Sequence, residues 1–303
     1  MGGRLASLWE MPEGVPVDVL VRAVLAGVAA SLACGLGVLP LFVPGLDPAK
    51  HKGLGYAFAG GLMFSASVYN LILPGLDLDG AGWGLADVSP IIAGMLVGAG
   101  FLALTDRHLH HEEEDVASAF VDQSGTAAGG APRPKRWKAW GGRTGLLVFV
   151  AMTVHSIPEG VAVGVGYTSD AVQEASAATS HQMSAEMAVA LGPTLALAIA
   201  IHNIPEGLAV AIPMRSAGAG LVRCFLAAVF TSLPQPIACI PAVLLAWFFR
   251  PIMPGLMGFA AGAMIFLVLL ELIPEALGEE KPAKIAWAFL AGFGGMLLVQ
   301  VIL

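Results

Sequence analysis

Charged side chains are scarce in this chain of 303 residues: Asp, Glu, Lys and Arg make up only 12% of it, whereas 57% of its residues are hydrophobic. Soluble globular proteins carry about a quarter charged residues. The composition therefore excludes an ordinary soluble protein and predicts a chain that crosses a lipid bilayer several times. Its 15 basic residues do not outnumber its 22 acidic ones, so we expect no nucleic acid partner.

Cysteine is also rare. The three cysteines, Cys34, Cys224 and Cys239, form no close pair in the sequence. This spacing signals neither a metal centre built from thiolates nor a disulfide framework. Glycine and proline, by contrast, are frequent, with 38 and 20 copies, which suits the tolerance of membrane helices for small and kinking residues.

Long apolar runs dominate the rest of the chain. A membrane helix needs about 20 apolar residues, and eight runs approach that length: 18–43, 54–76, 88–106, 144–167, 190–213, 221–249, 252–275 and 284–303. We predict an all-α polytopic membrane protein with eight transmembrane helices in one domain, residues 1–303.

The basic residues predict the orientation of these helices. Twelve of the 15 Lys and Arg residues lie in the first, third, fifth and seventh connections, and connections rich in Lys and Arg stay in the cytoplasm. Both termini are therefore expected to be extracytoplasmic. The plasma membrane is the expected location, with an organelle membrane as the alternative.

The third connection, residues 107–143, contains a run of His and acidic residues, then a stretch rich in Gly, Ala and Ser, then a basic run. This composition predicts a disordered cytoplasmic loop. Its three closely spaced histidines, His108, His110 and His111, leave two interpretations open. The tract binds transition metals weakly, or it is a solvated charged loop.

One motif, His-x-Ile-Pro-Glu-Gly, occurs twice within apolar runs, at 155–160 and at 202–207. On a helix, positions i and i+4 share a face, so each copy places an imidazole beside a carboxylate. Ionisable groups at bilayer depth cost about 3 kcal/mol each, and a divalent cation is the simplest compensation. Imidazole and carboxylate ligands suit Zn2+, and also Fe2+, Mn2+ or Cd2+.

Pairing of the His and Glu residues with one another, as a packing device, is the alternative interpretation. The shared proline and glycine argue against it. A proline inside a helix costs ~3 kcal/mol and frees a carbonyl, whereas the glycine after each Glu permits close helix approach. Each motif is thus expected to combine a kink, two ligands and a packing notch.

Further polar residues lie in the other apolar runs. Gln235 belongs to Ser232-Leu233-Pro234-Gln235-Pro236, where the prolines predict a broken helix. Glu271 and Glu275 form another i, i+4 pair near the predicted cytoplasmic side, as an exit site or as an interfacial helix end. Met63 and Asn70 lie in the second run, and a lone methionine is usually core filling.

These residues together resemble the ZIP (Zrt/Irt-like protein) family of divalent metal transporters. The resemblance covers nearly the whole chain and is strongest at 198–214 and 231–277. It implies a ZIP-type bundle of eight helices with external termini and a binuclear metal centre. The first metal is implied to bind His155, Glu159, His202 and Glu206, with Met63 nearby. The second is implied to bind Ser156, Asn203 and Gln235, sharing Glu159 and Glu206. The resemblance also implies Asn70 at the external entrance and Glu271 on the route to the cytoplasm.

Three positions depart from the family pattern. The family often has Asn at Ser156, Glu at Gln235, and His at Leu270, directly before Glu271. The lost carboxylate at position 235 predicts one strong and one weak or vestigial metal site, and Leu270 weakens the expectation of a tight exit site.

The leading hypothesis is import of a divalent transition-metal cation, with zinc as the first candidate. The alternative is an intramembrane zinc-dependent hydrolase, which needs three ligands, an open position and a general base. No His-Glu-x-x-His motif supports it, so we expect a protein that is not an enzyme and has no catalytic cofactor. The expected partners are divalent metal ions and the lipid bilayer, with a homodimer as one possible assembly.

Overall fold

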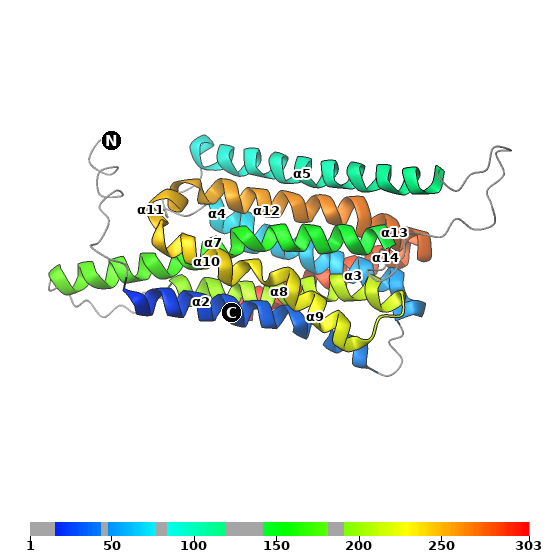
Figure 1. Ribbon diagram of the computed structural model, residues 1–303, viewed down its shortest axis with the longest axis horizontal. Helices are drawn as coiled ribbons and strands as arrows, with labels where there is room; N and C mark the ends of the chain where they lie inside the picture. The colour runs from blue at the N-terminus through cyan, green and yellow to red at the C-terminus, as the bar shows by residue number, and fades with distance from the viewer. Residues whose placement is uncertain (1–15, 44–47, 77–83, 119–141, 181–190, 303) are drawn as a thin grey trace.

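The computed structural model describes residues 16–43, 48–76, 84–118, 142–180 and 191–302. Within these ranges the chain forms helices and no strand. Eight helical spans are long and apolar enough to cross a membrane, which confirms the predicted all-α architecture. Figure 1 shows the long helices lying side by side along the long axis of the molecule.

The spans follow one another along the chain, several of them built from more than one helical segment. The first four are α2 (Val17–Leu36) with η1 (Leu39–Phe42); α3 (Pro48–Ala66), η2 (Ser67–Ile72) and α4 (Leu73–Leu76); α5 (Leu85–Ser118); and α7 (Gly142–Ser180). The last four are α8 (Leu191–Ser216); α9 (Leu221–Ser232) with α10 (Pro234–Leu244); α11 (Ala246–Phe249), η3 (Arg250–Ile252), α12 (Met253–Leu267), η4 (Val268–Leu272) and α13 (Ile273–Glu279); and α14 (Pro282–Ile302).

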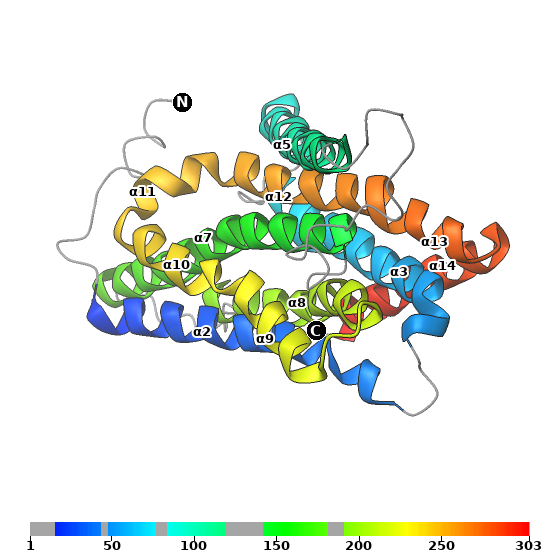
Figure 2. The same ribbon diagram turned by 45° about the vertical axis from the view of Figure 1, so that its right-hand side comes forward.

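The helices form two groups. The motif group comprises α2, α7, α8 and α9–α10. The support group comprises the second, third, seventh and eighth spans, in which η2, η4 and α13 join α3 to α12. In Figure 2, α5 lies along α12 and α2 lies beside α9. The two groups meet where α7 packs on α12 and where α8 packs on α3.

Glycines bring backbones together inside each group. A methyl group added at Gly207 of α8 would lie 1.7 Å from the carbonyl oxygen of Cys34 in α2. In the support group, one added at Gly61 of α3 would lie 2.0 Å from the carbonyl oxygen of Phe289 in α14. Between the groups, the corresponding atom at Gly55 would meet the end of the Ile212 side chain at 3.1 Å. The pairs α2–α8 and α3–α14 are therefore in close backbone contact, whereas side chains fill this part of the boundary between the groups.

The sixth span breaks at Leu233, between α9 and α10, as the two prolines that follow it, Pro234 and Pro236, predict. Its predicted end at residue 249 is wrong: the span ends at Leu244, because Leu245 leaves the helical conformation (φ −123°, ψ 37°). Residues Ala246–Phe249 form α11 and begin the seventh span. By contrast, α7 and α8 continue through Pro158 and Pro205 as single helices.

The third connection also differs from its prediction. Helix α5 continues to Ser118, so residues 107–118 are helical rather than a loop. The reason is local composition: His, Glu, Asp, Ala and Val continue a helix at modest cost, and no Gly or Pro interrupts them. The remainder of the predicted loop, 119–141, lies outside the described residues.

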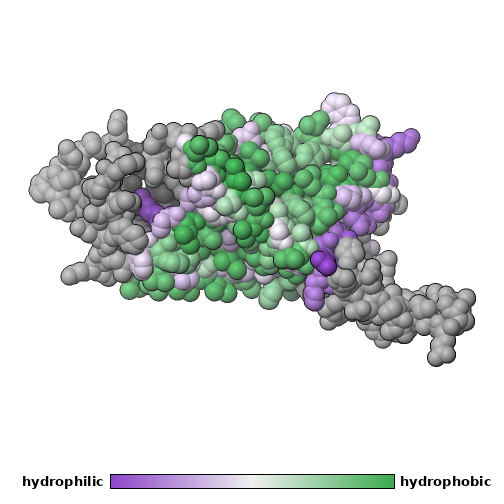
Figure 3. Space-filling view, turned by 90° about the horizontal axis from the view of Figure 1, so that it is seen from above, coloured by the Kyte–Doolittle hydropathy of each residue, from purple (hydrophilic) through white to green (hydrophobic). Residues whose placement is uncertain are grey.

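The outer surface of the bundle is apolar. Large hydrophobic side chains such as Leu96, Val222 and Trp287 are 69%, 74% and 75% exposed. Figure 3 shows hydrophobic residues covering the middle of the molecule, with hydrophilic residues gathered toward one end. Such a belt suits contact with lipid, and the chain is a multi-pass integral membrane protein.

Candidate metal centre

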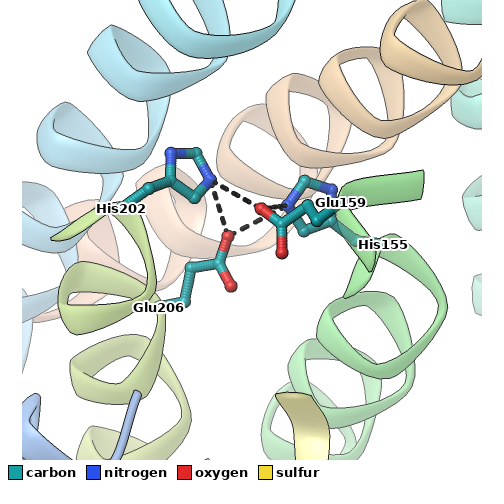
Figure 4. Close-up of side chains that lie close together, drawn as sticks. All are labelled: His155, Glu159, His202 and Glu206. Carbon is teal, nitrogen blue, oxygen red and sulfur yellow. Dashed lines mark hydrogen bonds and ion pairs between the residues drawn. The ribbon is translucent and has the colours of Figure 1, made fainter. Parts of the chain in front are cut away.

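The two motif copies meet at the centre of the bundle. α7 supplies His155 and Glu159, and α8 supplies His202 and Glu206. All four side chains are at most 1% exposed. Figure 4 shows them pointing toward one another from the two helices. The i, i+4 spacing within each copy thus produces the arrangement that helical periodicity predicts.

The donor atoms are spaced as metal ligands are. His155 Nε2 lies 3.0 Å from Glu159 Oε1 and 3.0 Å from Glu206 Oε1. His202 Nε2 lies 2.8 Å from Glu206 Oε1 and 3.4 Å from Glu159 Oε1. One donor atom from each residue fits within a separation of 4.8 Å from all the others. A tetrahedral zinc ion with bonds of ~2.0 Å keeps its ligands about 3.3 Å apart, which matches these imidazole-to-carboxylate distances.

Several of these buried atoms lack hydrogen bonds. Glu206 Oε2 and His155 Nδ1 have no hydrogen-bond partner among the described residues, whereas Glu206 Oε1 lies within ion-pair distance of both imidazoles. A buried charge without such partners is costly. Ion pairs with protonated imidazoles would offset part of this cost, whereas a bound divalent cation would balance the charge of both carboxylates.

The motif glycines set the distance to neighbouring helices. A methyl group added at Gly160 would lie 2.2 Å from the carbonyl oxygen of Gln235 in α10. Gly207 plays the same part against α2. This is the predicted packing notch after each Glu, and it seats α10 and α2 directly behind the ligands.

The residues expected at a second metal site instead form a hydrogen-bond network. Gln235 Nε2 donates to Glu159 Oε2, and Asn203 Nδ2 donates to Gln235 Oε1 at 3.0 Å and to the Ala30 carbonyl at 2.9 Å. Ser156 Oγ lies within donating distance of two backbone carbonyls, those of Met152 and Thr231, at 2.8 and 3.0 Å. Amide hydrogens therefore face Glu159 from the side where the second ion was expected.

The two expected residues of the second span lie in different settings. Asn70 is in η2, a π-helical turn, and its Nδ2 is 3.2 Å from His202 Nδ1. Asn70 thus contacts the imidazole of a candidate ligand. Met63 is fully buried in α3 among the apolar core residues. Its part as a soft neighbour of the metal stays a prediction.

Glu271 and Glu275 lie together in a polar cluster beside the N-terminal end of α7. Thr144 Oγ1 is placed to donate to Glu271 Oε2 at 2.9 Å or to Glu275 Oε1 at 3.2 Å. Arg143 Nη2 is 2.8 Å from Glu271 Oε1, and its Nη1 pairs with Asp106. Lys52 pairs with Glu275 at 3.1 Å.

Sequence reasoning missed the partners in this cluster. It counted Arg143 and Lys52 only as markers of orientation. A signal was present: Asp106 and Arg143 are opposite charges at the ends of the third and fourth apolar runs, on the same predicted side. Which carboxylate each cation meets depends on helix packing, so the sequence could indicate the pairing only in outline.

Comparison with known proteins points to one family. The family model described as ZIP zinc transporter matches residues 107–300. The chain is 33% identical over 260 residues to a candidate zinc transporter of Arabidopsis thaliana, covering 86% of this chain and 35% of the plant protein. It is 27% identical over 332 residues to human zinc transporter ZIP11, covering 89% and 93% of the two chains. It is 30% identical over 276 residues to zinc transporter GufA of Myxococcus xanthus, covering 89% and 94%. The chain thus spans about a third of the plant relative and most of the other two.

Proposed function

Since this chain belongs to the ZIP family of metal transporters, we propose that it imports a divalent transition-metal cation through the centre formed by His155, Glu159, His202 and Glu206. Zinc is the first candidate, with iron, manganese and cadmium as alternatives. The observation that carries the proposal is the enclosed set of two imidazoles and two carboxylates whose donor atoms all lie within 4.8 Å of one another. A site of this kind suits borderline metals and offers no thiolate to select copper(I).

We further propose that one ion occupies the centre at a time. Glu159 would present Oε1 to the ion, while its Oε2 accepts a hydrogen bond from Gln235. Since position 235 carries an amide instead of a third carboxylate, only Glu159 and Glu206 are left to offset the charges of two divalent ions. A second ion would also have to break the bonds of Asn203 to Gln235 and to Ala30.

Import would then proceed by ligand exchange. A cation on the extracytoplasmic side loses water and gains two imidazoles and two carboxylates near mid-span. Because all four ligands are buried, uptake and release need a movement that opens the centre to one side and then to the other. Close backbone contacts join helix pairs within each group, which favours movement of the motif group against the support group.

The test is metal uptake by proteoliposomes that hold the purified protein. Zn2+, Fe2+, Mn2+ and Cd2+ are compared, each with and without a pH gradient. Glu159→Gln and Glu206→Gln keep side-chain size and remove one charge each, and uptake of every cation should be abolished. Asp18→Asn is the matched control, because this carboxylate is 57% exposed and forms an ion pair with Arg22 of the same helix, away from the metal centre.

Uptake at the wild-type rate in both glutamine variants would contradict the proposal. The same preparation separates transport from the intramembrane hydrolase. Metal flux without turnover of any ester or peptide substrate supports a transporter, in keeping with relatives that are named as transporters.

A further inference from the structure

Arg143 lies where the two helix groups meet, at the end of the bundle that the basic residues predict to be cytoplasmic. It occupies the first turn of α7 in the motif group. Its guanidinium contacts Asp106 of α5 and Glu271 of η4, both in the support group. The side chains of Arg143, Asp106 and Glu271 are 21%, 16% and 2% exposed. One largely enclosed cation therefore ties a helix of one group to two helices of the other.

Thr144 completes the contact. Its hydroxyl is 2.9 Å from Glu271 Oε2, while Arg143 Nη2 is 2.8 Å from Glu271 Oε1. Adjacent residues of α7 thus engage both oxygens of one carboxylate. Both carboxylate oxygens of Glu271 are therefore in contact with side chains of the motif group.

The other cation nearby does not link the groups. Lys52 of α3 pairs with Glu275 at 3.1 Å and with Glu279 at 3.4 Å, and all three residues belong to support-group spans. Beside them lies a pocket of about 270 Å³, lined in part by Arg143, Glu271, Glu275 and Glu279. A cation that reached this pocket would meet three carboxylates. Only one of them, Glu271, is paired with a cationic side chain of α7.

We propose that Arg143 is an internal counter-cation that holds Glu271 while the metal centre is closed, and that it withdraws with α7 when the motif group moves. The departing metal ion then meets Glu271 briefly, and the returning guanidinium displaces it. Guanidinium and divalent metal compete for the same carboxylate, and charge-assisted pairing of Arg with carboxylate is strong and directional. Arg143 is thus a positioning residue that keeps the exit from becoming a metal trap. This inference rests on the proposed function and deepens it.

A structural ion pair makes different predictions. If Arg143 only neutralised a buried carboxylate, its removal would lower stability and leave the number of bound metal ions unchanged. If it competes with metal, its removal creates a new cation site at Glu271. Metal stoichiometry distinguishes the two roles.

The experiment compares wild type, Arg143→Gln, Arg143→Lys and the double variant Arg143→Gln/Glu271→Gln. Radioactive Cd2+ bound per folded chain is measured by equilibrium dialysis, and zinc flux at saturating zinc is measured in proteoliposomes. We expect Arg143→Gln to bind one more Cd2+ than wild type and to lose several-fold in flux, because ions leave Glu271 slowly. The double variant should return to the wild-type count. Arg143→Lys should give Cd2+ binding and zinc flux between those of wild type and Arg143→Gln, since Lys keeps the charge but lacks the planar guanidinium.

A folded Arg143→Gln protein with the wild-type Cd2+ count overturns the inference. Should that variant aggregate, Arg143→Lys and Thr144→Val decide the matter. A weak additional Cd2+ binding step in either one supports the inference, and wild-type binding and flux in both overturn it. Failure of the proposed function is a separate outcome, because it would appear as a lack of metal uptake by the wild-type protein itself.

Discussion

The contact between Asn70 and His202 bears on which nitrogen of the His202 imidazole is free to bind a metal ion. Asn70 Nδ2 lies 3.2 Å from His202 Nδ1, on the far side of the ring from Nε2, which faces Glu206. A histidine that binds metal through Nε2 carries its proton on Nδ1, and a neighbouring acceptor usually holds that proton. The side-chain amide of Asn70 can turn to present its oxygen there, which would orient His202 for ligation.

Asn70→Ala is therefore expected to weaken zinc binding by about 10- to 100-fold, the usual effect of losing a partner that orients a metal ligand. Asn70→Asp, which keeps an acceptor, should retain most of the affinity. Titration calorimetry on the detergent-solubilised protein measures both. Equal affinities for Asn70→Ala and wild type would show that the contact has no part in ligation.

Gln235→Glu tests the one-ion proposal. The new carboxylate would face Glu159 where Gln235 now donates a hydrogen bond, so the two charges repel unless a cation lies between them. We expect the metal-free variant to unfold at a lower temperature than wild type, and zinc to restore the loss while the bound metal rises from one ion to two. Metal analysis after dialysis and thermal unfolding provide the measurements, and Gln235→Leu is the control without the added charge. A variant that still binds one ion contradicts the proposed role of the amide.

At this scale, spacing along the chain predicts some of the site and packing decides the rest. The four candidate ligands follow from the helical period and the cost of burying charge. The network of Ser156, Asn203 and Gln235 does not, because its members join helices whose register only the folded chain defines. For the same reason the position of Gln235 was expected correctly in a broken helix, while its bond to Glu159 was not foreseen.

Two π-helical turns interrupt the support group. η2 carries Asn70 and η4 carries Glu271, and each of these residues contacts the motif group, at His202 and at Arg143. Single π turns inside α-helices often occur at functional sites. The structure thus places a widened turn at each of two polar contacts across the group boundary.

Gly207→Ala tests the backbone contact between α8 and α2. Its added methyl would overlap the carbonyl oxygen of Cys34, and overpacking typically costs about 1–3 kcal/mol. We expect a clear fall in the unfolding temperature and in the yield of monodisperse protein. Gly100→Ala in α5 is the matched control, since no atom lies within 4 Å of its added methyl, and it should be neutral or slightly stabilising. Similar stability of the two variants would contradict the packing argument.

Helix existence was predictable because eight apolar runs match the thickness of a bilayer, and all eight appear. Boundaries set by single residues were harder. The apolar run through Leu245 contains no residue that predicts a break there. Helix α5 continues past the end of its own apolar run because the polar residues that follow are compatible with a helix. The π turns have no signature in a hydropathy pattern, so only the structure shows them.

At the scale of the whole molecule, transport should require the two groups to move relative to each other. Gly55 and Ile212 lie across the boundary, whereas Gly60 and Val268 lie within the support group, and the two pairs have similar close approaches of 3.1 and 3.2 Å. Cysteines at Gly55 and Ile212, joined by a short bifunctional thiol reagent, are expected to stop zinc flux. The same treatment of cysteines at Gly60 and Val268 should leave flux near its untreated value.

A reducing agent that cleaves the linker should restore flux in the first variant. The buried native cysteines are common to both variants and cancel in the comparison. Full flux through the protein cross-linked between the groups would exclude their relative movement as the basis of transport.

The stretch of α7 between Thr144 and His155 has a consequence for how fast ions can pass. Leu147, Val148, Ala151 and Met152 are all at most 1% exposed, so an apolar seal separates the four ligands from the polar cluster at the end of the helix. Such a seal would keep an ion from drifting through under a voltage. Each cation must wait for one cycle of the protein. Electrical recordings should therefore show no unitary currents, while tracer zinc accumulates at a rate that saturates with concentration.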